Sequence, residues 1–110
     1  MNLTTAIRDH YAVIDIVGRL TATGAPQLRN AVNELIDAGS NRIVIDMSRT
    51  EFVDSTGLGA LVGGLKSARV AGGDLRVAAV QDSVRTVLRL TNLDRVLRNH
   101  ETPESAFDGR

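Results

Sequence analysis

A strand-to-helix junction in the middle of the chain constrains the fold more than any other stretch. The apolar run 42–47 is typical of a strand, and the run that opens at Asp54-Ser55-Thr56 has the composition of a helix ending near Gly72. Side chains of these three types cap helices by accepting hydrogen bonds from backbone N–H groups of the first turn. A cap at this point also places a hydroxyl at the surface, beside the positive end of a helix dipole.

Strand and helix patterns follow one another along the rest of the chain. Early strands followed by alternating helices and strands predict an α/β or α+β sheet with right-handed crossovers. The predicted strands are 3–9 and 11–17, joined by a turn at Asp9-His10, a short piece at 19–20 after Gly18, and the runs 43–45 and 75–80. Gly18 is expected to end the second strand.

The predicted helices are recognised by their caps and their apolar spacing. Thr23 is expected to cap the first, which ends at Gly39, and Asp82 to cap the third. A further helix start is expected at 102–105. Residues 93–97 fit either an extension of the helical region or a short last strand. The apolar stripe of the first helix consists of Leu28, Ala31, Val32, Leu35 and Ile36.

Composition argues against several classes of function. Thirteen basic and thirteen acidic residues cancel, and two Phe, one Tyr and no Trp offer few surfaces for stacking bases, so no nucleic-acid partner is expected. There is no cysteine and only two isolated histidines, so neither a metal nor a cofactor is expected. No apolar run has the length of a membrane span or a signal peptide, which favours a cytoplasmic protein without a membrane partner.

Enzyme motifs are incomplete. The glycine-rich run before Lys66 has one residue too many for a phosphate-binding loop, and it lies inside a predicted helix. Ser55 does not match the Gly-x-Ser-x-Gly pattern of a hydrolase nucleophile, and no histidine lies in a position that the sequence can link to it. Asp46 lacks the acidic pair that a receiver domain uses to hold its metal. We therefore expect no catalytic activity.

Four glycines in the second helix need an explanation, because each destabilises a helix interior by about 0.8–1.0 kcal/mol relative to Ala. For Gly63 and Gly64 we expect close packing against a neighbouring element. For Gly57 and Gly59, close packing and an open surface for a partner are equally compatible with the sequence.

The octapeptide 52–59, together with Gly18-Arg19-Leu20 and the segment 72–75, resembles the STAS family. More narrowly, it is similar to the anti-sigma factor antagonists, and the resemblance extends from Leu3 to Phe107. It implies one STAS domain over residues 1–110, with a mixed β-sheet flanked by about four α-helices.

The resemblance also implies a site and partners. Ser55 matches the serine that a partner kinase phosphorylates, and Thr56 is the alternative acceptor. The implied partner is an anti-sigma factor serine kinase, bound by the unphosphorylated form so that a sigma factor is released, with a phosphatase acting on phospho-Ser55. The implied partner-binding residues are Asp54, Ser55, Thr56, Gly57, Leu58 and Gly59. The chain departs from the family at Thr21, where an aspartate is common.

Other interpretations stay open at this point. One alternative is that Asp54-Ser55-Thr56 is a plain helix cap. The domain is alternatively a stand-alone STAS subunit of another assembly, such as a stress-sensing complex or a lipid transporter. A third alternative is a nucleotide-sensing domain that uses the same helix N-terminus.

Overall fold

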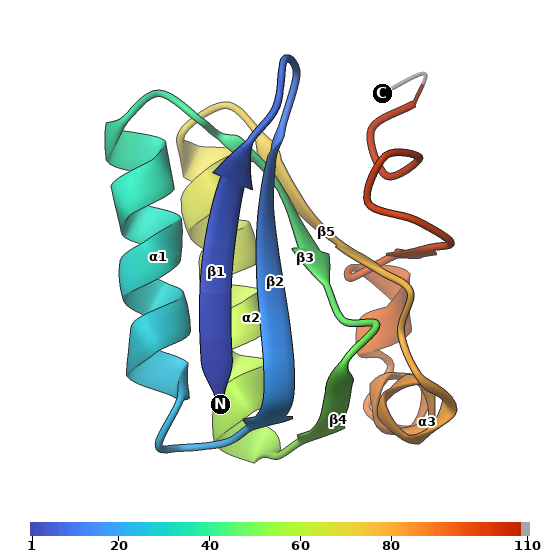
Figure 1. Cartoon of the computed structure of the whole chain (residues 1–110). Helices are drawn as coiled ribbons and strands as arrows, with labels where there is room; N and C mark the ends of the chain where they lie inside the picture. The colour runs from blue at the N-terminus through green and yellow to red at the C-terminus, as the bar shows by residue number, and fades with distance from the viewer. Residues whose placement is uncertain (109–110) are drawn as a thin grey trace.

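The strands form one mixed sheet that runs through the molecule, as Figure 1 shows for the computed structural model, which describes residues 1–108. The order across the sheet is β1-β2-β3-β5-β6, and β4 pairs separately with β2. Among the strand pairs of residues 1–108, only β1–β2 is antiparallel. The strands are β1 (Asn2–Ile7), β2 (Ala12–Leu20), β3 (Arg42–Asp46), β4 (Thr50–Val53), β5 (Asp74–Ala78) and β6 (Asn99–His100).

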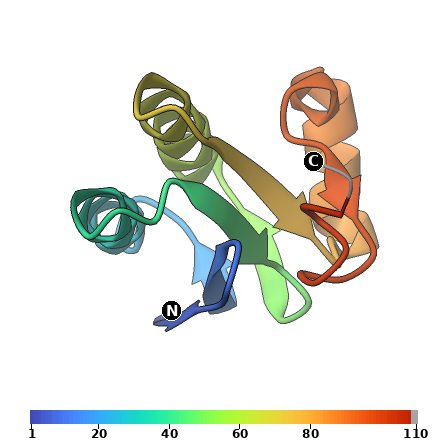
Figure 2. The same cartoon turned by 90° about the horizontal axis from the view of Figure 1, so that it is seen from above.

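Three α-helices connect these strands within residues 1–108. They are α1 (Ala25–Asp37), α2 (Ser55–Val70) and α3 (Asp82–Leu90), and a single 3₁₀ turn, Leu93–Arg95, follows α3. Figure 2 shows α1 and α2 side by side over one face of the sheet, with α3 and the C-terminal segment near its β5 end. The predicted α/β class with a mixed sheet is therefore confirmed.

The main core lies between the sheet and the pair α1–α2. Ala12, Ile14 and Ile16 alternate inward along β2 with no exposed surface. The central strand β3 is buried on both of its faces, as its uninterrupted apolar run predicts. A smaller cluster on the opposite face joins Val44 of β3 to Phe107 of the C-terminal segment. None of the helices within residues 1–108 combines the length and apolarity required to cross a bilayer.

The expected fourth α-helix is not formed, and the prediction of about four helices is wrong by one. Residues 101–108 form turns. Ser105 Oγ donates to the Thr102 carbonyl oxygen at 3.0 Å, and such a local side-chain bond competes with a helix. Ala106 and Phe107 then bury their side chains against the sheet instead of continuing as a helix.

Strand β2 does not end at Gly18. Strand β2 pairs with β3 from Ala12 to Asp15 and with β4 from Gly18 to Leu20. Gly18 adopts φ +102°, and the β2–β4 register shifts between Gly18 and Arg19, as at a glycine bulge. The short piece expected at 19–20 is the end of β2, and β4 was not expected at all.

The caps of α1 and α3 also differ from expectation. Gly24, not Thr23, is the N-cap of α1. The turn before the helix is held by a hydrogen bond that Ala25 N–H donates to the Thr21 carbonyl oxygen at 2.9 Å. Gln81 is the N-cap of α3, so that Asp82 occupies the first turn, where its charge favours the helix dipole. The ambiguous residues 93–97 begin with the 3₁₀ turn.

Candidate functional site

Helix α2 begins immediately after β4, and Asp54 is its N-cap. The extended backbone of Asp54, φ −93° and ψ −177°, turns its side chain toward the helix start. Oδ1 of Asp54 accepts a hydrogen bond from Gly57 N–H at 2.7 Å. The predicted cap is confirmed and assigned to Asp54, which fixes the first turn of α2 on the end of β4.

Asp54 also holds the loop between β2 and α1. Its Oδ2 accepts from Ala22 N–H at 3.3 Å, and its own N–H donates to the Leu20 carbonyl oxygen at 3.2 Å. Thr21, where the resemblance leads us to expect an aspartate, lies between these two contacts. Both carboxylate oxygens of Asp54 are therefore engaged inside the chain, and its side chain is half-buried.

Ser55 and Thr56 occupy the first turn of α2 and are both exposed. Neither hydroxyl forms a side-chain hydrogen bond with another residue of the range 1–108. The first turn of a helix also leaves backbone N–H groups without intrahelical partners, and the dipole makes this end positive. Two free hydroxyls are thus presented at an electropositive position.

Gly57 and Leu58 lie beneath this surface. A Cβ added to Gly57 would lie 2.4 Å from the Leu20 carbonyl oxygen, so only glycine allows α2 to approach β2 this closely. Leu58 is 8% exposed and belongs to the main core. Of the predicted partner-binding residues, these two support the surface from below and do not form it.

The other three glycines of α2 differ in their surroundings: one packs closely against a neighbouring strand, and two face open space. Gly64 packs closely, since an added Cβ would lie 3.0 Å from Leu75 Cδ1. The same expectation for Gly63 is wrong, because nothing lies within 4 Å of an added Cβ there. Gly59 is exposed, with Arg29 Nη2 at 3.9 Å from its added Cβ as the nearest group.

Two exposed residues beside the helix start were not among the predicted site residues. Arg19 at the end of β2 pairs in register with Phe52 of β4, and its guanidinium lies 4.5 Å from the centre of the Phe52 ring. Phe52 is 38% exposed. Figure 1 shows that β2, β4 and the start of α2 meet at one end of the molecule. We call Arg19, Phe52, Ser55, Thr56 and Gly59 the Ser55 surface.

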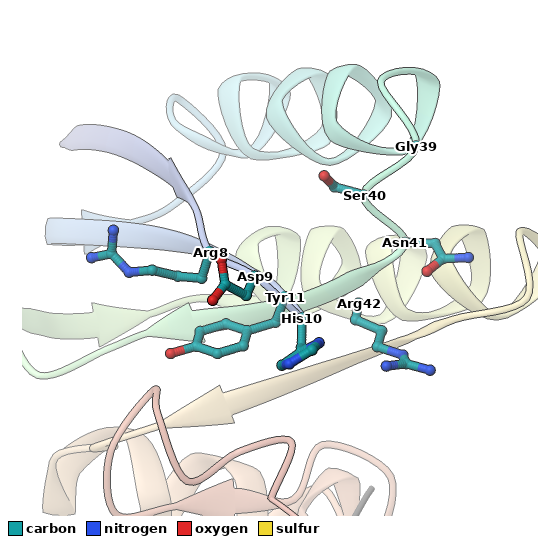
Figure 3. A pocket seen from close by; sticks show the side chains of 8 residues that line it. All are labelled: Arg8, Asp9, His10, Tyr11, Gly39, Ser40, Asn41 and Arg42. Carbon is teal, nitrogen blue, oxygen red and sulfur yellow. The ribbon is translucent and has the colours of Figure 1, made fainter.

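A cavity of about 210 Å³ at the opposite end of the sheet is a weaker candidate. It lies between the β1–β2 turn and the α1–β3 loop, and Figure 3 shows the Arg8 and Tyr11 side chains extending to one side and Arg42 to the other. Within residues 1–108, no group of three or more His, Asp or Glu side chains is placed to hold a metal ion. The Ser55 surface is therefore the principal candidate.

Three features define this protein as an α/β domain of the STAS type. They are the strand order, the pair of helices on one face of the sheet, and the exposed, capped start of α2. The chain belongs to the STAS domain family, since the family model described as "Mlab, STAS domain" matches residues 3–99.

Relatives with functional names cover almost the whole domain. The chain is 31% identical to a provisionally named anti-sigma factor antagonist of Thermotoga maritima, over 89% of this chain and 93% of that protein. A crystal structure of such a protein from the same organism matches with a TM-score of 0.88 at 30% identity, covering 97% of this chain and 92% of that chain. The anti-sigma-B factor antagonist of Staphylococcus aureus is 25% identical, over 94% of this chain and 96% of its own.

The fold is also shared with SpoIIAA of Bacillus, an anti-sigma factor antagonist solved in two states. The unphosphorylated form matches with a TM-score of 0.76 at 21% identity, covering 98% of this chain and 96% of that chain. The phosphorylated form matches with a TM-score of 0.75 at 22% identity, covering 98% of both chains. At this identity the likeness concerns the fold alone.

Proposed function

We propose that this chain, as one STAS domain, is an anti-sigma factor antagonist controlled by phosphorylation of Ser55. In its unphosphorylated form it binds an anti-sigma factor serine kinase in the cytoplasm and thereby releases a sigma factor. The observation that carries the proposal is the exposed hydroxyl of Ser55 at the start of α2, held in place by the Asp54 cap. The names of the relatives in Thermotoga and Staphylococcus support it.

The surroundings of Ser55 favour it over Thr56 as the phosphate acceptor. Residues four apart lie above one another on a helix. Below Ser55 this row continues with Gly59, which is exposed, and Gly63, which has no neighbour within 4 Å of an added Cβ. Below Thr56 it continues into Ala60, which is fully buried. A kinase active site that approaches Ser55 therefore meets an open backbone.

A phosphate on Ser55 should leave the domain folded. The helix dipole favours the phosphate, whereas the neighbouring Asp54 carboxylate repels it. Each effect is about 1 kcal/mol, small beside a domain stability of about 5–15 kcal/mol. The close TM-scores of this chain to both forms of SpoIIAA agree with a fold that tolerates both states. Control then lies at the interface, and a phosphatase acting on phospho-Ser55 would restore binding.

A second candidate is a stand-alone STAS subunit of another assembly. The observation that favours it is the name of the matching family model, Mlab, which differs from the names of the antagonists. In that case the Ser55 surface would contact a subunit of the assembly and not a kinase.

Affinity capture from the native cell separates the two candidates. The wild-type chain, Ser55→Ala and Ser55→Asp serve as baits, and Thr56→Ala is the matched control. The proposal expects an anti-sigma factor kinase on the first two baits and on Thr56→Ala, but not on Ser55→Asp. Capture of transporter subunits by all four baits, with no anti-sigma factor, would support the second candidate and overturn the first.

A further inference from the structure

Four arginines gather around a second cavity, far from the Ser55 surface. They are Arg69 at the end of α2, Arg76 of β5, Arg95 of the 3₁₀ turn and Arg98 just before β6. The cavity measures about 340 Å³. Fourteen residues of helix separate Ser55 from Arg69, a distance of about 21 Å at 1.5 Å per residue. We call this cavity the arginine pocket.

Two of the four guanidinium groups are held in place by one carboxylate. Asp74 Oδ1 accepts from Arg69 Nε at 3.3 Å, and Asp74 Oδ2 accepts from Arg76 Nε at 3.1 Å. Arg76 is further fixed by donating to the Ala106 carbonyl oxygen at 2.6 Å and by stacking 4.4 Å from the centre of the Phe107 ring. Part of the pocket is therefore organised before any ligand arrives.

The other two guanidinium groups are available to a ligand. Arg95 and Arg98 are exposed, and neither has an ion-pair partner in the part of the chain that the structure describes. Asp74 is already shared by two arginines, and the remaining acidic group of the lining is Asp108. The pocket therefore carries an excess of positive charge, although the chain as a whole has formal net charge zero.

His100 adds a neutral imidazole to the lining. Its Nε2 is buried and has no hydrogen-bond partner among residues 1–108. Burial, followed by the positive charges of Arg76 and Arg98, lowers the pKa of His100 below its ordinary value. An anion bound between Arg76 and Arg98 would offset their positive charges and so raise the pKa of His100.

We propose that the arginine pocket binds a compact polyphosphate anion, either free pyrophosphate or the phosphate chain of a nucleoside di- or triphosphate. The planar fork of arginine matches phosphate oxygens in pairs, and several forks around one cavity suit several phosphate groups. A volume near the lower limit of small-molecule sites suits a ligand of this size. Among the described residues of the lining Val96 is the only apolar one, and no Phe, Tyr or Trp ring is present, so we assign recognition to the phosphate groups and not to a base.

Calorimetry with pyrophosphate tests the proposal directly. Arg95→Gln and Arg98→Gln remove charges from exposed side chains, and each should weaken binding about tenfold or more. Arg89→Gln, an exposed arginine of α3 outside the pocket, is the matched control and should bind like the wild type. Asp108→Asn removes the opposing charge and should tighten binding. Equal affinities in all variants, or no binding at millimolar pyrophosphate, would overturn the proposal.

The ligand's identity and the independence of the pocket have separate readouts. Adenosine should not bind, whereas ADP should bind with the affinity of pyrophosphate if only phosphates are recognised; tight binding of adenosine would contradict the assignment. Proton NMR of His100 should show its pKa rising when pyrophosphate binds, and an unchanged pKa would place the ligand elsewhere. Ser55→Asp should leave all these values unchanged, so this test does not depend on the proposed function.

Discussion

Asp54 Oδ2 accepts a hydrogen bond from the backbone N–H of Ala22, 32 residues earlier in the chain. This bond fastens the loop before α1 to the first turn of α2, while the other oxygen caps the helix. The residue that the family resemblance assigns to partner contact is thus already used by the fold. Its substitution should affect stability as well as binding.

Asp54→Ala should lower the free energy of unfolding by about 1–3 kcal/mol, because it removes a helix cap and leaves the Ala22 N–H without its acceptor. Asp37→Ala, at an exposed acid near the end of α1, is the matched control and should change stability by less than about 0.5 kcal/mol. Urea unfolding measures both. Equal losses in the two variants would show that the Asp54 contacts contribute nothing.

Gly57→Ala and Gly63→Ala should have opposite effects, although both lie in α2. At Gly57 the new methyl would collide with the Leu20 carbonyl oxygen, which should destabilise the domain by about 1–3 kcal/mol. At Gly63 it would meet no neighbour, and the better helix propensity of Ala should stabilise by about 0.5–1 kcal/mol. Thermal unfolding should separate the two melting temperatures, and a loss of stability at Gly63 would refute the open surface.

His100 should make stability depend on pH. Its pKa is lowered in the folded state, so the unfolded chain binds more protons as the pH falls below the ordinary value of about 6.5. Stability should therefore be intact above that value and decrease as the pH drops toward the lowered pKa. His100→Gln should lack this component between pH 7.5 and 5. The melting temperature of each protein is measured across this pH range. The same pH dependence of the melting temperature in both proteins would contradict the assignment.

Ser55→Asp should remain folded, since the helix dipole and the Asp54 charge act on the new carboxylate in opposite directions. We expect its free energy of unfolding to stay within about 1 kcal/mol of the wild type. Circular dichroism with urea titration measures this, and Ser55→Ala serves as the uncharged control. A largely unfolded Ser55→Asp would mean that the switch acts through the fold.

Much of the fold follows from local patterns in the sequence. The alternation of Ile14 and Ile16 indicates one buried face of β2, and the uninterrupted apolar run at 43–45 indicates a strand covered on both sides. Asp54 was recognisable as part of a cap because its residue type and its place before a helical run are both local signals.

What could not be predicted depends on distant contacts. Strand β4 begins with Thr50, a polar residue that is fully buried because its Oγ1 donates to the Ile16 carbonyl oxygen at 2.8 Å. Without β4, the Arg19–Phe52 pair beside the site has no sequence signal, since the two residues meet only through the β2–β4 pairing. The same holds for Gly63, whose surroundings are set by how α1 and α2 pack.

The central claim is that the charge state of Ser55 controls capture of an anti-sigma factor kinase. A phosphate carries about −1.5 to −2 charges. Burying an unpaired charge at an interface costs several kcal/mol. Because each 1.4 kcal/mol changes affinity about tenfold, phosphorylation of Ser55 should weaken binding strongly.

The most direct measurement is calorimetry of Ser55→Ala and Ser55→Asp with the purified anti-sigma factor kinase in its ADP-bound state. We predict that Ser55→Ala binds as tightly as the unphosphorylated wild type and that Ser55→Asp binds at least about 100-fold more weakly. Equal affinities of the two variants for the kinase would contradict the claim and leave Ser55 as a residue of the helix start only.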